Sequence, residues 1–230
     1  MSLVVQTACG FTVPASHGGD AGRDNATPDD AAAADGAPDA HLDAAIDASG
    51  TPITASFPIT QDTNVDSLNP TTTYGAVQAV LVDGPPQTAV ILMRSELSSI
   101  PSSASVQVVT LHIWTSQTLG DSSSIYDVLE AWDEASAIWA LRATGQTWAG
   151  TGASPPSRGT VVRGTIPAPQ TQYTETVVAL DAAAVGGWVA QPGSNYGFAI
   201  VTTGSNGTGF RSREDTTAGR RPYLTITYRP

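Results

Sequence analysis

Five of the ten arginines in this chain lie within residues 209–230, and the chain has no lysine. A guanidinium group binds a carboxylate through two parallel hydrogen bonds and can donate to a backbone carbonyl as well. The closing arginines therefore suit either contact with an anionic ligand or internal ties that fasten the last strand. The position of Arg213 beside Glu214, and of Arg221 before Pro222, favours internal ties. The predicted tying residues, with Glu96, Glu134 or Asp62 as acidic partners, are Arg94, Glu96, Arg213 and Arg221.

Aromatic rings beside planar polar groups would bind sugars, because the C–H faces of a pyranose pack on a ring while its hydroxyls pair with polar side chains. Trp114 shares a strand face with His112 and either faces solvent or lies under a covering loop. Trp148 lies in the glycine-rich stretch TGQTWAGTGASPP, and Arg211 is among the closing arginines that we expect to be exposed. The predicted ligand-binding residues are Trp114, Trp148, His112 and Arg211. The predicted core tryptophans are Trp132, Trp139 and, as the anchor of a short helical turn, Trp188.

Acid–base catalysis has few candidate residues. Two of the three histidines, His17 and His41, lie in a segment rich in alanine and aspartate, which leaves His112. A lyase that acts on a uronate chain would use a histidine or tyrosine base, so His112 with Tyr126 or Tyr173 is the available combination. The sequence has no G-x-S-x-G elbow for a serine nucleophile and too few histidines and cysteines for zinc. We therefore predict no catalytic residue.

Short alternating segments predict β-strands from residue 56 onward. The clearest are VQVVTLHIW (residues 106–114) and YLTITY (residues 223–228). Further strands are predicted by AVQAVLVDG, TAVILM, SIYDVLEAW, GTVVRGTI, YTETVVALD and NYGFAIVTT. Short helical turns are predicted at residues 133–138 and 181–188, the second with Asp181 as its N-cap. This pattern indicates an all-β fold, a β-jelly roll or β-sandwich of two antiparallel sheets.

Composition divides the chain into two parts. Residues 1–55 carry eight aspartates and one arginine among alanine, glycine and proline, so we predict a disordered tether. Residues 56–230 carry thirteen acids and nine arginines and are long enough to bury a two-sheet core. The net charge of -11 excludes nucleic acid as an expected partner, because phosphate backbones require a basic surface. We expect a monomer.

The only cysteine, Cys9, precedes the tether in VVQTACG. The small residues before it are similar to the end of a bacterial lipoprotein signal, although a basic n-region is missing and the apolar run is short. This likeness predicts lipidation of Cys9 and a secreted or outer-surface location in a bacterial cell envelope, with membrane contact only through the lipid. The alternative is an ordinary soluble N-terminus with an incidental cysteine.

Several stretches, in order, resemble the DNRLRE-type domain, also classed as carbohydrate-binding module family 96. They are DTNVDSLNPTTTYG, LMRSELSSIP, WDEASAIW, NYGFAI, FRSRED and RPYLTITY. The positions that match the family pattern are Asp62, Asn69, Tyr74, Gly75, Arg94, Glu96, Pro101, Trp132, Asp133, Glu134, Trp139, Ser212, Arg213, Glu214, Arg221 and Pro222. The resemblance covers nearly all of residues 56–230. It implies a β-jelly roll that binds polysaccharide, alginate in some members, on a secreted or surface protein.

Two departures from the family pattern bear on the ligand. Ser95 stands where the pattern has an aromatic residue, and few basic residues are available to hold uronate carboxylates, so a neutral glycan is the alternative to an acidic one. Jelly-roll modules of this kind commonly carry a structural calcium ion near the first and last strands. The predicted calcium ligands are Asp62, Asp66, Glu214 and Asp215. Alternatively, Glu214 pairs with Arg94 or Arg213 in a salt-bridge network.

The sequence thus predicts a non-catalytic carbohydrate-binding or adhesion module of a secreted or surface-anchored bacterial protein, with a polysaccharide ligand. A structural surface domain without a sugar ligand is the first alternative, and a polysaccharide lyase-like enzyme is the second. Exposed aromatic rings beside planar polar groups would favour sugar binding, whereas burial of every tryptophan would favour the structural domain.

Overall fold

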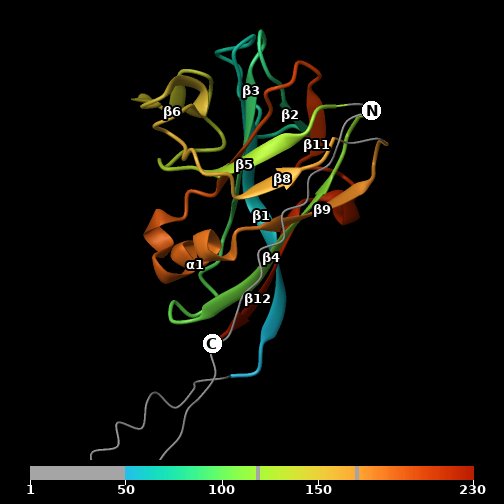
Figure 1. Cartoon of the computed structure of the whole chain (residues 1–230). Helices are drawn as coiled ribbons and strands as arrows, with labels where there is room; N and C mark the ends of the chain where they lie inside the picture. The colour runs from blue at the N-terminus through green and yellow to red at the C-terminus, as the bar shows by residue number, and fades with distance from the viewer. Residues whose placement is uncertain (1–49, 118–119, 169–170) are drawn as a thin grey trace, which may run out of the picture. The chain divides into compact units, whose positions relative to one another are not determined.

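The computed structural model describes residues 50–117, 120–168 and 171–230 (Figure 1). Its strands are β1 (Ile53–Asp66), β2 (Ala79–Val82), β3 (Ala89–Ser95), β4 (Ser105–Trp114), β5 (Ser123–Asp127), β6 (Leu141–Ala143), β7 (Gln146–Thr147), β8 (Gly164–Ile166), β9 (Glu175–Leu180), β10 (Phe198–Val201), β11 (Thr208–Arg211) and β12 (Tyr223–Arg229). The helices are α1 (Ala182–Ala190) and the 3₁₀ turns η1 (Thr151–Ala153), η2 (Pro192–Ser194) and η3 (Ala218–Arg220). Together they confirm the predicted all-β fold of the sandwich or jelly-roll type.

The main sheet has eight antiparallel strands in the order β8-β5-β10-β3-β1-β12-β4-β9. Strand β1 runs through its centre and changes partner: residues 53–58 pair with β12, and residues 59–66 pair with β3. We call the part around β12, β4 and β9 the β4 sheet, and the part around β3, β10, β5 and β8 the β3 sheet. The backbone of β8 lies against β9, so the two edges of the sheet come together.

The inner core lies between these two sheets. Alternate residues of each strand point into it, as the period of a β-strand requires. The largest buried side chains of this core are Ile91, Met93, Leu111, Ile113, Ile125, Ile166, Phe198, Ile200, Phe210, Leu224 and Ile226. Helix α1 contributes Val185 and Val189 from the segment between β9 and β10.

A second core covers the outer face of the β3 sheet. Val65, Val90, Leu92 and Ala199 point outward from β1, β3 and β10 and are buried. The segment between β5 and β8 folds over them and contributes Val128, Trp132, Ala137, Trp148 and Ala153. Strand β3 is therefore buried on both faces, which explains its continuous apolar run AVILM. The outer face of the β4 sheet is open in comparison, with Val108 and Val177 exposed by 54% and 56%.

Several predicted boundaries differ from the structure. Strand β1 was not predicted, because its polar residues and Pro58 interrupt the alternation that identifies a strand. It begins at Ile53, so residues 53–55 belong to the folded domain and not to the tether. The rest of the predicted tether up to residue 49, including Cys9, lies outside the described residues. Residues 133–138 form a turn, whereas α1 forms at the second predicted position with Asp181 as its N-cap.

Candidate functional site

Three rings form a row on the open outer face of the β4 sheet. His112 and Tyr223 are register partners on β4 and β12, and their rings stack at 4.3 Å between centroids with an interplanar angle of 6°. The Trp114 ring lies 6.0 Å from the Tyr223 ring at 36°. Tyr223 is thus the middle ring, and Trp114 is one end of what we call the aromatic row. All three residues are half-buried.

Polar side chains line the aromatic row. The Nδ1 atom of His112 lies 2.7 Å from a Glu175 carboxylate oxygen, and its Nε2 atom lies 3.1 Å from the Thr225 hydroxyl. Burial, together with the negative charge of Glu175, raises the pKa of Tyr223 above its usual value, so this phenol stays neutral near pH 7. Further along the same face the hydroxyls of Thr54 and Thr227 share a hydrogen bond of 2.8 Å. The face therefore offers rings and hydroxyls together.

The predicted ligand residue Arg211 is not freely exposed. It is half-buried, forms a 3.2 Å ion pair with Asp215, and places its guanidinium carbon 4.7 Å from the centre of the Tyr173 ring. Arg220, also half-buried, lies 4.3 Å from the same ring. These cation–π contacts and the ion pair hold the arginines against the protein. The cluster lies just beyond the Trp114 end of the row, since the carbonyl of Thr115 accepts the backbone N–H of Tyr173.

The prediction that Trp148 binds a ligand is wrong for this structure. Its side chain is 4% exposed, and its indole N–H donates to the Ile138 carbonyl at 3.0 Å. Trp132, predicted to be core, is buried beside it and donates to the Tyr196 carbonyl at 2.8 Å. Both rings fill the second core, because the glycine-rich segment closes over the β3 sheet instead of projecting into solvent. Trp188 is half-buried and packs against the inner core, in agreement with an anchor.

Arg213 lies at the centre of an acidic cluster. Its guanidinium donates to both oxygens of Glu134 at 2.7 Å, and its Nε lies 2.8 Å from Glu214. Its backbone N–H donates to Asp62 Oδ2 at 2.7 Å. We call Asp62, Glu134, Arg213 and Glu214 the clasp. Gly75 belongs to its wall, because a Cβ at that position would lie 2.3 Å from the Glu134 carbonyl oxygen.

Asp62 of the clasp is completely buried and occupies an unusual electrostatic position. Burial, with a further contribution from Glu214 and Glu134, raises the pKa of Asp62 to about 8, even though the Arg213 backbone N–H opposes the rise. Its Oδ1 atom and the Glu214 Oε2 atom are buried and accept no hydrogen bond from the described residues. Two carboxyl groups that face each other in this way can share one proton.

The four predicted calcium ligands are not brought together. Asp62 and Glu214 meet, and Glu134 joins them with one oxygen of each within 4.8 Å of the others. Asp66 lies four residues from Asp62 along β1, a span of about 13 Å, and so stays outside this group. It accepts hydrogen bonds from Leu68 and Asn69 instead.

Asp215, the fourth predicted calcium ligand, accepts a hydrogen bond from Thr217 and pairs with Arg211. Glu134 was missed as a ligand because it lies far from Asp62 in sequence. The salt bridge predicted as the alternative, Glu214 with Arg213, is present.

The remaining predicted tying residues make weaker contacts. Arg94 lies 3.6 Å from Glu96, whose side chain is 59% exposed. Arg221 donates to the Asp215 carbonyl at 2.9 Å and so closes the turn before β12. Of the two tyrosines considered as partners of His112 in a lyase, Tyr126 lies on β5 of the β3 sheet, beneath Arg158, and Tyr173 lies beneath Arg211 and Arg220.

Comparison with known proteins identifies no relative, so the sites are interpreted from their geometry. The helices that the structure describes include none with the length and hydropathy of a transmembrane span. No protein-family model matches the chain, and no curated protein matches it.

Proposed function

We propose that this protein is a non-catalytic polysaccharide-binding module and that the aromatic row is its binding surface. The observation that supports the proposal most strongly is the row itself, in which Trp114, Tyr223 and His112 lie side by side on the open face of the β4 sheet. A ring at the end of such a row keeps one face free of its neighbours. Trp114 can therefore receive the C–H face of a pyranose.

The polar groups around the row fit sugar hydroxyls. Glu175, exposed by 39%, accepts hydrogen bonds, and the hydroxyls of Thr110, Thr225 and Thr227 both donate and accept. The threonine hydroxyls continue along β4 and β12 for several residues, so the hydroxyls of successive sugar units could form hydrogen bonds with them. The open face thus suits a polymer better than a compact ligand.

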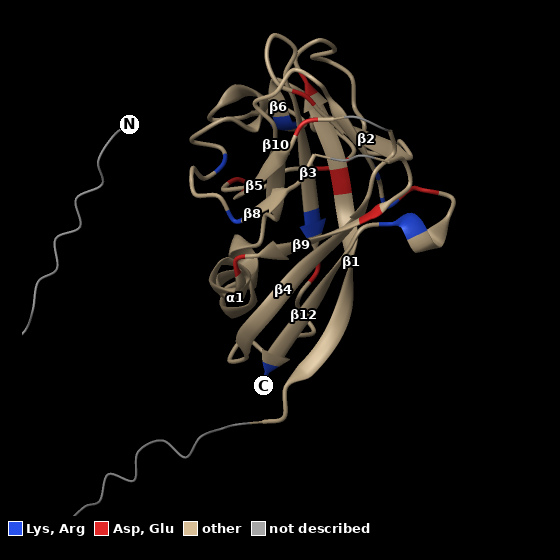
Figure 2. Cartoon of the chain, turned by 45° about the vertical axis from the view of Figure 1, so that its right-hand side comes forward, with Lys and Arg blue, Asp and Glu red and all other residues tan. Residues whose placement is uncertain are grey.

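The charge of the face favours a neutral polysaccharide. Strand β4 carries no charged side chain, and the paired part of β1, residues 53–58, carries none (Figure 2). Glu175 on β9 and Arg229 on β12 are the charged residues among β4, β9, β12 and residues 53–58 of β1. A uronate chain carries one carboxylate per sugar and would need several cations in a row. Of the two arginines beyond the Trp114 end of the row, Arg211 is already paired with Asp215, which leaves Arg220 as a single cation.

The proposal is tested by comparing polysaccharide capture by the full chain with capture by Trp114→Ala. We expect affinity electrophoresis in gels that contain neutral or acidic polysaccharides to show retardation by a neutral one, weakened at least about tenfold in the variant. Val108→Ala, on the same face but away from the row, is the matched control and should bind like the parent.

Two outcomes would overturn the proposal. Unchanged retardation of Trp114→Ala would remove the row from the binding surface. Absence of retardation in every polysaccharide would favour the structural surface domain. In that interpretation the aromatic residues serve only to pack the fold, as the buried Trp132 and Trp148 do. Melting curves for both variants show whether the fold is retained.

We also propose that the module is held at a bacterial cell surface through a lipid on Cys9. The support is the short residue pattern before this cysteine and the resemblance of the following domain to surface modules. Expression in a bacterium, followed by mass spectrometry of the N-terminal peptide, tests this. A peptide without a lipid adduct in the parent, or the same membrane fraction for Cys9→Ser, contradicts the anchor.

A further inference from the structure

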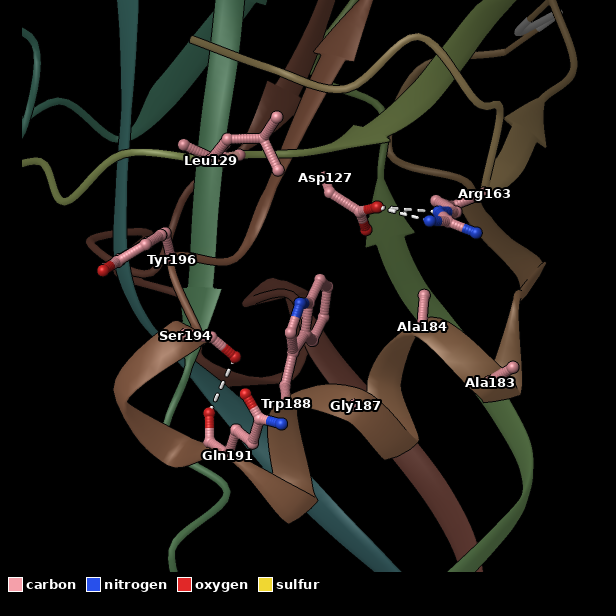
Figure 3. Close-up of a pocket in the computed structure, with 11 residues that line it drawn as sticks. Asp127, Leu129, Arg163, Ala183, Ala184, Gly187, Trp188, Gln191, Ser194 and Tyr196 are labelled. Atoms are coloured by element: carbon pink, nitrogen blue, oxygen red, sulfur yellow. Dashed lines mark hydrogen bonds and ion pairs between the residues drawn. The ribbon is translucent and has the colours of Figure 1, made fainter.

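A pocket of about 390 Å³ lies beside α1, between the helix and the end of β5 (Figure 3). Its volume is near the lower end of the range for small-molecule sites, about 300–1,000 Å³. The residues that matter below are Asp127, Arg163, Gly187, Trp188, Gln191 and Tyr196. None of them belongs to the aromatic row. The same helix sends Val185 and Val189 into the inner core, on the side of the β4 sheet opposite to the row.

Charged side chains form one wall of the pocket. The Arg163 guanidinium donates to Asp127 Oδ2 at 2.8 Å and to Asp181 Oδ2 at 2.7 Å, which fixes all three groups. The other oxygen of Asp127, Oδ1, is buried and accepts no hydrogen bond from the described residues. Asp127 and Asp181, against the single guanidinium of Arg163, give this ion-pair cluster a formal charge of -1, and its members Asp127 and Arg163 line the pocket. The cluster therefore attracts hydroxyl donors and repels carboxylates.

The opposite wall is aromatic and has free polar edges. Figure 3 shows the Trp188 ring rising from α1 toward Asp127, with Tyr196 on the other side of the pocket. In the part of the chain that the structure describes, the Trp188 indole N–H, the Gln191 amide and the Tyr196 hydroxyl make no hydrogen bond. The pocket thus combines a ring face, the Asp127 carboxylate and the unpaired Trp188 N–H and Gln191 amide, whereas the Tyr196 hydroxyl points away from it in Figure 3.

We propose that this pocket is a second binding site and that it takes one neutral pyranose unit, stacked on Trp188 with hydroxyls directed to the accessible part of the Asp127 carboxylate and to the Gln191 amide. A purely apolar ligand would cover the Trp188 indole N–H and the Gln191 amide without giving them partners, which is unfavourable. A uronic acid would bring a carboxylate toward a wall that already has negative charge.

A neighbouring pocket indicates how a longer glycan would leave this site. It has a volume of about 230 Å³ and shares Trp188 and Tyr196 with the first. Its other residues include Arg94 and Ser98, which can pair with hydroxyls, and Asn195, whose amide is bonded to the backbone of Ser95 and Gly197. The site therefore accommodates a chain end whose next unit passes over Trp188.

The test uses the full chain labelled with ¹⁵N and the methyl glycosides of glucose, galactose and mannose as probes, with glucuronate and galacturonate as matched acids. We expect at least one neutral glycoside to shift the Trp188 indole N–H signal, which is assigned with Trp188→Phe. The corresponding uronate should bind at least about tenfold more weakly.

A blocking variant keeps the result interpretable. Gly187 lines the pocket, and a Cβ added to it would meet nothing within 4 Å, so Gly187→Leu adds apolar volume at the pocket without a clash at its Cβ. Leucine also has the higher helix propensity, so α1 should persist. We expect Gly187→Leu to weaken the glycoside at least about tenfold, whereas Ala190→Leu, exposed on the same helix outside the pocket, should bind like the parent.

The site is overturned if no neutral glycoside shifts the Trp188 signal, if Gly187→Leu binds as tightly as the parent, or if the uronates bind as tightly as the neutral sugars. Its failure is distinct from failure of the aromatic row. Trp114→Ala should lose polysaccharide retardation and keep the glycoside-induced shift of the Trp188 signal. Gly187→Leu should lose that shift and keep the retardation by a polysaccharide that binds the aromatic row.

Discussion

Arg213 joins three segments that are far apart in the sequence, through Asp62 on β1, Glu134 before β6 and its own position after β11. Glu134 has a side chain exposed by only 14%, so removal of the guanidinium leaves a largely buried carboxylate without its partner. We expect Arg213→Ala to lower the free energy of unfolding by about 2 kcal/mol, measured by urea denaturation.

Arg220→Ala is the control for this substitution. Arg220 contacts the Tyr173 ring and forms no ion pair among the described residues, so we expect its loss to change the free energy by less than about 1 kcal/mol. Equal stability of Arg213→Ala and the parent, combined with loss of binding to an acidic polysaccharide, would show that the closing arginines bind a ligand and do not tie the fold.

The raised pKa of Asp62 predicts a pH-dependent stability. The folded-state pKa of about 8 lies above the unfolded value of about 3.9, so between these values the folded protein holds a proton that the unfolded chain has released. The contribution of Asp62 is therefore fully present below about pH 4 and is lost as the pH rises through about 8. In EDTA, we expect the melting temperature to fall across this window and Asp62→Asn to flatten that fall.

Calcium would compete with the same proton. If calcium binds the carboxylates of Asp62, Glu134 and Glu214, its affinity must increase as the proton leaves. The calcium prediction therefore requires added Ca²⁺ to raise the melting temperature more at about pH 8 than at about pH 6. A melting temperature that calcium and EDTA both leave unchanged would mean that Arg213 and the proton are the partners of these acids.

At the scale of elements, the second core makes the segment between β5 and β8 part of the folded structure. Trp148 packs there against the outer face of the β3 sheet and is almost completely buried. We expect Trp148→Ala to lower the free energy of unfolding by about 3 kcal/mol or more, because it removes a large ring and leaves a cavity.

The half-buried Trp114 provides the comparison for Trp148. Trp114→Ala should destabilise the domain clearly less, since its ring lies on the open face of the β4 sheet. Urea denaturation of both variants, followed by far-UV circular dichroism, measures the difference. Equal losses of stability would place Trp114 in a core as well and would weaken the case for the aromatic row.

At the scale of the whole molecule, the composition of the first fifty-five residues predicts a tether, and the structure places the first strand at Ile53. Exposed segments with small and polar residues are the usual sites of proteolytic cleavage. We expect limited digestion with elastase to leave a resistant product that begins between residues 40 and 53. Mass spectrometry of the product gives its ends. Survival of the intact chain under conditions that degrade an unfolded control would contradict the tether.

Local patterns determined part of this protein. The alternation in residues 106–114 was sufficient to predict β4 and to place His112 and Trp114 on one face, because side-chain direction in a strand follows from the backbone of that strand alone. The aspartate before three alanines was sufficient for the N-cap of α1, since a cap involves neighbours in sequence. The arginine and acids of the clasp were also visible as residue types.

The tertiary structure decided which of these residues meet. Tyr223 joins the aromatic row because β12 pairs with β4, Trp148 is buried because a distant segment covers the β3 sheet, and the α1 pocket forms where β5 approaches the helix. Strand β1 escaped prediction for the same reason. Its buried polar residues, Asp62 above all, are tolerated through partners supplied by segments more than seventy residues away, and such contacts leave no periodic trace in the local sequence.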